Sequence, residues 1–360
     1  MTKLLPIFLI GCFKLPAEME AIDTTVVPFN NPYVTADDVV IQGFNTELEC
    51  PNGDPSRFFL VYSEGLTEAV PDSTQSWNAP VAIVLHSGAF DYVMESGDAG
   101  PLSGPHYHAD SRLEPNFSTA KVWETLGLQI DDVDPAENNL GTLPAALADR
   151  GVVQLIPGNC WGDLWHNEEG VQYNDLNRDG FTRNGRTFAW WMVRLLTEPD
   201  FATAQGIDIP VNLDASQLYL VGLGDGGRGV AELLTHEGMP EVKAALVDSS
   251  PDDLNAYLEA EIDFEDEIEG ISRIFGEEAL GNIGDWSFTG DIPLPERLVY
   301  LWSDGDPQLP ATAASAAAST LSGRPGVWVR NPGVQDHVLS NSDNQLAREV
   351  VDYMLDGTRP

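Results

Sequence analysis

The sequence predicts an α/β protein built on a mainly parallel, doubly wound sheet. Short continuous apolar runs, typical of strands buried on both faces, recur along most of the chain. Segments with the apolar spacing of amphipathic helices lie between several of these runs. One strand-to-helix turn is rich in glycine. Strands that alternate with helices are typical of parallel sheets.

The expected elements follow one another from about residue 36. The first two strands, at 39–41 and 58–62, could pair antiparallel. The later strands are expected at 81–85, 152–156, 218–221, 244–247, 298–302 and 327–329. Helices are expected around 188–195, after the glycine-rich turn at 222–227, and at roughly 341–355.

The chain is expected to divide into an export signal, a tether and one folded domain. Residues 1–11 form the signal and 12–35 the tether, which contains proline and acidic residues without periodicity. Residues 36–77 supply the N-terminal strands, and 78–360 form the main domain. Within it, nine of positions 252–269 are Asp or Glu and none is basic, so we interpret 252–292 as a lid-like insertion.

The first residues have the plan of an export signal, with Lys3 before the apolar run 4–10. Residues 9–12, Leu-Ile-Gly-Cys, resemble a bacterial lipobox, in which the cysteine is lipidated. This resemblance implies lipidation of Cys12 and a place in the cell envelope or outside the cell. An uncleaved apolar N-terminus or a misplaced start codon is the alternative.

The chain carries a strong negative charge, with 57 acidic against 18 basic residues and a net charge of −39. Such a field repels phosphate backbones and anionic lipid headgroups. The sequence therefore disfavours nucleic-acid partners, and we expect membrane contact only through the lipid anchor at Cys12.

Export would place Cys50 and Cys160 in an oxidising compartment, where a disulfide between them is expected. Two buried free thiols are the alternative. Neither residue lies in a spacing typical of a zinc site.

The glycine-rich turn reads Gly-Leu-Gly-Asp-Gly-Gly over 222–227 and joins an expected strand to an expected helix. It matches the G-x-S-x-G nucleophile elbow, except that Gly224 holds the serine position. Small residues are needed at Gly222 and Gly226 because the turn is tight. A dinucleotide-binding loop is the competing interpretation, but that loop usually follows the first strand of its domain.

With this turn, the chain resembles the α/β-hydrolase superfamily over roughly 78–355. Residues 86–90, His-Ser-Gly-Ala-Phe, are similar to its oxyanion loop. The resemblance implies oxyanion donors from Gly88 or Ala89, together with the N–H of Asp225.

Two later loops are similar to those that supply the catalytic acid and base of this superfamily. Residues 303–310 carry Asp306 at the acid position, with Asp304 as second choice, and residues 333–338 carry His337 at the base position. The order nucleophile, acid, base is the one that this fold uses.

The resemblance implies descent from serine esterases or peptidases with a Ser-His-Asp triad, acting on a small-molecule ester or a peptide. Gly224 offers no oxygen for an acyl intermediate, so we expect a ligand-binding protein that is inactive or weakly active. The alternative is an active hydrolase that uses Asp225 as nucleophile, or water activated by His337. Ser249 and Ser250 end a strand and could face the same cleft as substitute nucleophiles, but they are expected to act as caps. An adhesion protein without a His–Asp contact is a third hypothesis.

No cofactor is expected, apart from a structural calcium ion. Asp175, Asn177 and Asp179 copy the first half of a calcium-binding loop, although Arg186 stands where an EF-hand has its bidentate Glu. An Asx turn is the alternative for this segment. The pair His106 and His108 is too weak a pattern to predict a metal site.

Overall fold

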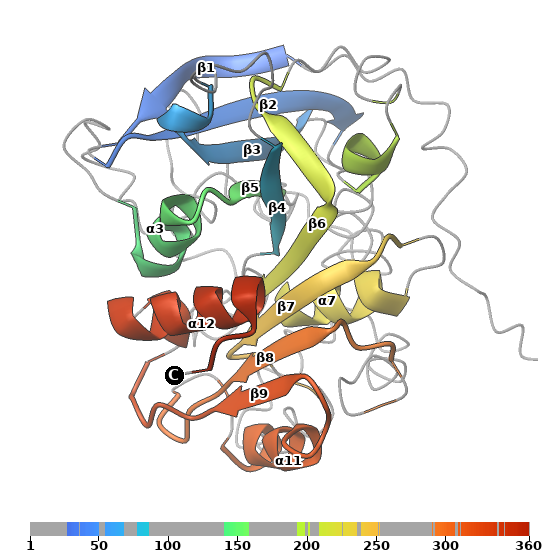
Figure 1. Ribbon diagram of the computed structural model, residues 1–360, viewed down its shortest axis with the longest axis vertical. Coiled ribbons are helices and arrows are strands. Elements are labelled where there is room, and N and C mark those ends of the chain that lie inside the picture. Colours follow the sequence, from blue (N-terminus) through green and yellow to red (C-terminus); the bar gives the residue numbers. More distant parts are fainter. Residues whose placement is uncertain are drawn as a thin grey trace, which may run out of the picture.

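The computed structural model confirms an α/β fold with one large mixed sheet (Figure 1). It describes residues 27–35, 37–49, 55–67, 78–85, 140–157, 193–198, 201, 209–224, 226–235, 239–250, 252, 290, 292–306, 309, 311–336, 338–341 and 343–359. Within these ranges, nine strands form a sheet in the order β1-β2-β3-β5-β4-β6-β7-β8-β9.

The N-terminal part of the sheet is antiparallel. Strand β2 (Val39–Glu49) pairs with β1 (Val27–Val34) on one side and with β3 (Pro55–Ser63) on the other, and β3 pairs antiparallel with β5 (Val153–Pro157). A 3-10 turn, Glu64–Thr67, follows β3. The expected antiparallel pairing of the first two predicted strands is therefore confirmed.

The rest of the sheet is parallel, and β4 (Asn78–Leu85) lies between β5 and β6 (Asn212–Leu223). Strands β7 (Val242–Asp248), β8 (Arg297–Leu301) and β9 (Val327–Arg330) follow outward from β6. Each contains an apolar run identified in the sequence, buried along most of its length.

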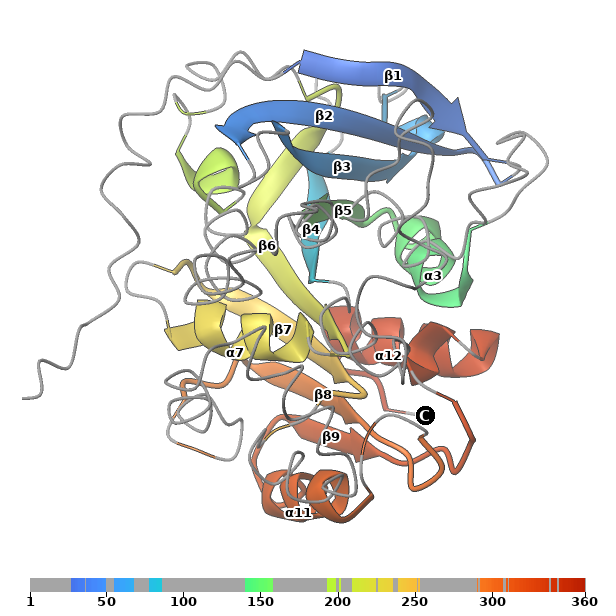
Figure 2. The same ribbon diagram turned by 180° about the vertical axis from the view of Figure 1, so that it is seen from behind.

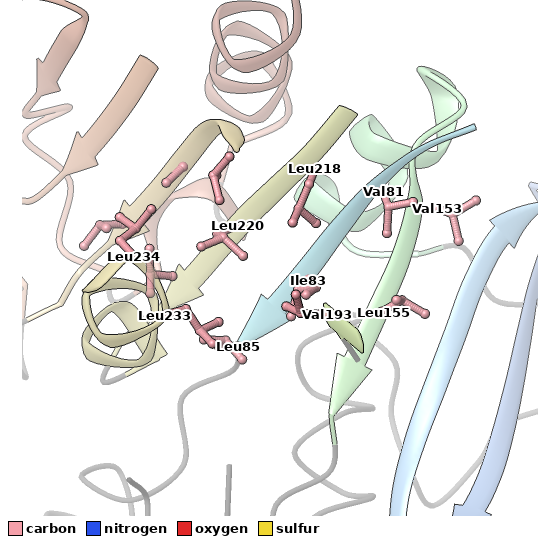
Figure 3. Packing of buried hydrophobic residues seen from close by; sticks show 14 of the residues in the cluster. Val81, Ile83, Leu85, Val153, Leu155, Val193, Leu218, Leu220, Leu233 and Leu234 are labelled. Carbon is pink, nitrogen blue, oxygen red and sulfur yellow. The ribbon is translucent and has the colours of Figure 1, made fainter. Parts of the chain in front are cut away.

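Helices cover both faces of the sheet, as a doubly wound fold requires (Figures 1 and 2). On one face, α3 (Thr142–Asp149) and α12 (Asn344–Asp356) pack against each other and against β3, β5, β7 and β8. On the other face, α7 (Gly226–Thr235) and α11 (Ala311–Leu321) contribute side chains to a second core. Figure 3 shows how Leu233 and Leu234 of α7 join Leu85 and Leu220 in that core.

The last helix begins close to the expected place because Asp343 caps it. The Asp343 side chain accepts hydrogen bonds from the N–H groups of Gln345 and Leu346, at 2.7 and 2.9 Å. A 3-10 turn, η9 (Leu339–Asn341), precedes this cap. The cap of α12 and the turn η9 therefore hold the backbone in place shortly after position 337.

The tether prediction is wrong for residues 27–34, which form edge strand β1. Pro28 and Pro32 suit an edge because proline cannot donate to a neighbouring strand. Residues 1–11 and 253–289 lie outside the described residues, so the export signal and almost all of the lid-like insertion stay predictions. Among the helices that the structure describes, none combines the length and hydropathy needed to cross a membrane.

Candidate functional site

The predicted elbow is a tight strand–turn–helix unit, in which β6 ends at Leu223 and α7 begins at Gly226. A Cβ on Gly222 would lie 2.5 Å from the Gly227 Cα and 2.7 Å from the Gly226 carbonyl oxygen. Both the close packing and the need for glycine at 222 are therefore confirmed. Gly227 is the glycine that packs most closely on Gly222, although the elbow motif in the sequence points to Gly226.

Gly224 stands at the apex of this turn with φ +54°, in the left-handed region. Glycine adopts this conformation freely, whereas other residues are strained in it. The Gly224 N–H donates to the carbonyl oxygen of Asp248 at 2.8 Å, and the Gly227 N–H donates to the Gly224 carbonyl at 3.2 Å. The apex is therefore tied to the carboxyl end of β7.

The Asp248 side chain at this strand end is fully buried and accepts four hydrogen bonds. Its Oδ1 accepts from the Leu339 N–H at 3.0 Å and from the Ser249 hydroxyl at 3.0 Å. Its Oδ2 accepts from the Ser340 N–H at 2.8 Å and from the Ser340 hydroxyl. Burial raises the pKa of Asp248, and the hydrogen bonds from Ser340, Ser249 and Leu339 oppose that rise.

The predicted acid loop follows β8 and is braced by its own hydrogen bonds. Asp306 is half-buried, and its Oδ1 accepts from the Leu309 N–H at 3.0 Å. The buried Ser303 hydroxyl accepts from the Gly305 N–H at 3.2 Å and donates to the Val334 carbonyl. Since Val334 belongs to the predicted base loop, the acid and base loops are in direct contact.

The predicted base loop follows β9 and meets the end of β7. The Val338 N–H donates to the Ser249 hydroxyl at 3.2 Å. Val338 and Ser249 have φ angles of 55°, an uncommon conformation for residues other than glycine and most unfavourable for a β-branched one. The described residues on both sides of position 337 therefore lie in a loop that contacts β7 and the acid loop.

Several predicted site residues lie outside the described part of the chain. Among these are the base itself, the three oxyanion donors, the lipidation site, the cysteine pair and the calcium ligands: His337, Gly88, Ala89, Asp225, Cys12, Cys50, Cys160, Asp175, Asn177 and Asp179. Of the predicted triad positions, the structure describes Gly224 and Asp306. The described residues include no group of three or more His, Cys, Asp or Glu side chains arranged to hold a metal ion.

Sequence reasoning missed Asp248 and Ser303 and expected Ser249 to act as a cap. A signal for Asp248 was present, because an acidic residue directly extends the apolar run 244–247. Buried carboxylates need hydrogen-bond partners, so a carboxylate at the end of a buried strand indicates a polar network. Its partners at 339 and 340 are 91 and 92 positions away and have no such pattern.

Comparison with solved structures returns α/β-hydrolase enzymes, and the three described here share only 10–13% of their residues with this chain. Oligopeptidase B from Leishmania major has a TM-score of 0.48 and 12% identity, with 93% of this chain covered and 37% of the peptidase. A carboxylesterase from Lactobacillus plantarum has a TM-score of 0.47 and 10% identity, covering 93% of this chain and 96% of the esterase. An esterase from Lactobacillus rhamnosis has a TM-score of 0.46 and 13% identity, covering 85% of this chain and 80% of the esterase.

The chain spans only 37% of the length of oligopeptidase B and 41% of the length of an acylaminoacyl peptidase that it also resembles. No protein-family profile and no curated protein sequence matches it. The molecule's own organisation identifies its fold. A mostly parallel, doubly wound sheet carries a glycine-lined turn after β6, the predicted acid loop after β8 and the predicted base loop after β9, in the order that hydrolases of this type use. The chain has the α/β-hydrolase fold.

Proposed function

We propose that this protein binds small-molecule esters or peptides through a hydrolase-type site that forms no covalent acyl intermediate. The observation that carries the proposal is Gly224, which occupies the apex between β6 and α7 with φ +54°. Acyl transfer through a triad needs a hydroxyl or thiol at this position, and glycine has neither.

The proposal also assigns roles to the two later loops. His337 is the base and Asp306 the acid, while the N–H groups of Gly88 or Ala89 and of Asp225 bind the substrate carbonyl oxygen. The contact of Ser303 with Val334 supports this assignment, because it joins the acid loop to the base loop. Backbone donors of this kind bind a carbonyl whether or not a nucleophile is present.

We also propose an export signal, a lipid anchor, a disulfide and a calcium site for this protein. The protein is exported and lipidated at Cys12, Cys50 pairs with Cys160, and calcium binds at Asp175, Asn177 and Asp179. Lipidation at Cys12 would hold the hydrolase-type domain at the cell envelope.

Reaction with a fluorophosphonate probe tests the central assignment. The natural protein should take up no probe at position 224, whereas Gly224→Ser should react at least about 100-fold faster than the natural protein, since loss of a triad member costs several orders of magnitude. Labelling is measured as bound probe per protein and located by peptide mass spectrometry. The substituted residue must adopt a left-handed conformation, so this variant should be less stable by roughly 1–2 kcal/mol.

Gly323→Ser is the matched control. Gly323 lies in the turn after α11, and no atom lies within 4 Å of the position that its Cβ would take, so an added hydroxyl there is tolerated but remote from the site. It should remain unlabelled. A folded Gly224→Ser variant that takes up no probe would contradict the proposal.

An active hydrolase without a serine remains the second candidate, and the contact between acid and base loops favours it, since a supported histidine can activate water. Turnover of p-nitrophenyl acetate by the natural protein distinguishes the two candidates. Robust turnover that disappears in His337→Ala would favour the water mechanism. Turnover that disappears in Asp225→Asn would instead favour Asp225 as nucleophile.

A further inference from the structure

We propose that Asp248 is the positioning residue of this site, setting the distance between the elbow apex and the base loop. This proposal rests on the proposed function only for the role of His337 as base. No feature of the sequence resemblance assigns a role to Asp248.

Asp248 contacts both the elbow apex and the base loop. The backbone carbonyl of Asp248 accepts the Gly224 N–H at 2.8 Å, and its carboxylate accepts the N–H groups of Leu339 and Ser340 at 3.0 and 2.8 Å. Backbone and side chain of one residue, separated by a single Cβ, therefore hold the apex and the segment that follows the base. A shift of either segment would break hydrogen bonds to Asp248.

The neighbouring residue extends this contact to the position next to His337. The Ser249 hydroxyl donates to Asp248 Oδ1 and accepts from the Val338 N–H. Ser249 is buried, and its own N–H donates to the Leu301 carbonyl at 3.1 Å, which anchors it on β8. The hydrogen bond to Ser249 therefore holds Val338 in its left-handed conformation.

The chemistry of Asp248 suits this task better than an amide would. Each carboxylate oxygen accepts from one backbone N–H, and neither N–H can reverse its role. In Asp248→Asn, either orientation of the amide places an NH₂ donor against the N–H of Leu339 or of Ser340. The substitution preserves the volume of the side chain but removes one of its two backbone contacts.

The first experiment measures hydrogen exchange of the full-length natural protein and of Asp248→Asn. We expect the amide of Leu339 or Ser340 to exchange at least about tenfold faster in the variant, because it loses its acceptor. Leu321→Ala, which removes a buried side chain from α11, controls for general loss of stability and should not accelerate these amides beyond its effect on the whole core. Unchanged protection at both amides in Asp248→Asn would overturn the proposal.

The second experiment uses the Gly224→Ser background and the rate of fluorophosphonate labelling. Adding Asp248→Asn should slow labelling by about 100-fold in a protein that is still folded, because small displacements of a base have effects of that size. Adding Leu321→Ala should change the rate less than about twofold, since a loss of stability alone leaves the folded site intact. Equal rates with Asp248 and Asn would contradict a positioning role.

If Asp248→Asn does not fold, Ser249→Ala provides the test. It removes the acceptor of the Val338 N–H without adding volume, so exchange at Val338 and the labelling rate should change in the same directions. If Gly224→Ser takes up no probe, the proposed function fails. The exchange measurements, made with Gly224 in place, then still decide whether Asp248 holds the base loop.

Discussion

Gly222→Ala is expected to lower the free energy of unfolding by about 3 kcal/mol, the upper range for overpacking a closely packed interior. The added methyl would lie 2.5 Å from the Gly227 Cα and 2.6 Å from its nitrogen. Both are backbone atoms of the first turn of α7, so no side-chain rotation can relieve the overlap. The helix must move away from β6, and the elbow opens with it.

Denaturant unfolding followed by circular dichroism measures this effect. Gly323→Ala is the control, because nothing lies within 4 Å of its Cβ position. Its unfolding free energy should stay within about 0.5 kcal/mol of that of the natural protein, as at most surface sites. Equal stability of the two variants would show that α7 does not pack on Gly222 as described.

The second large effect is expected for Gly326→Ala, at the turn that leads into β9. Gly326 has φ +73°, and a Cβ there would lie 2.2 Å from the Glu296 carbonyl oxygen. Its own carbonyl accepts from the Leu298 N–H at 2.9 Å and from the Tyr353 hydroxyl at 2.8 Å. The turn thus joins β8, β9 and α12, and we expect a loss of about 3 kcal/mol or more from strain and overlap together.

Gly333→Ala separates these two causes. Gly333 has φ +70° but no atom within 4 Å of its Cβ position, so only the left-handed conformation is penalised, by roughly 1–2 kcal/mol. The difference between the two variants, measured by denaturant unfolding, is the cost of the overlap with Glu296. A loss at Gly333 as large as at Gly326 would contradict that interpretation.

Strands and the elbow could be predicted because their signals are local. The run 81–85 is apolar throughout and lies in β4, and the sequence 222–227 alone indicated the tight turn. Helices α3 and α11 were not predicted. The latter reads Ala-Thr-Ala-Ala-Ser-Ala-Ala-Ala-Ser-Thr-Leu, in which small residues give only a weak difference between a buried and an exposed face. Tertiary packing, rather than a distinct pattern, identifies its buried side.

The chain order of the loops at the candidate site could be predicted from the sequence, but the hydrogen bonds that connect these loops could not. Gly224 and Asp306 follow expected strands, so the topology of the sheet brings their loops to one edge. The bonds from Asp248 to Leu339 and from Ser303 to Val334 join residues that are 91 and 31 positions apart. Contacts of this range depend on the register of several strands and leave no periodicity in the sequence.

The central claim, that position 224 faces the base loop, is tested most directly with a thiol in place of the missing nucleophile. Alkylation of Gly224→Cys by iodoacetamide across a pH series, resolved by peptide mass spectrometry from Cys12, Cys50 and Cys160, gives the pKa of the introduced thiol. We predict a pKa clearly below the ordinary value of about 8.5, and a rise toward that value when His337→Ala is added, because a neighbouring imidazolium stabilises a thiolate. The same thiol pKa with and without His337 would contradict the account.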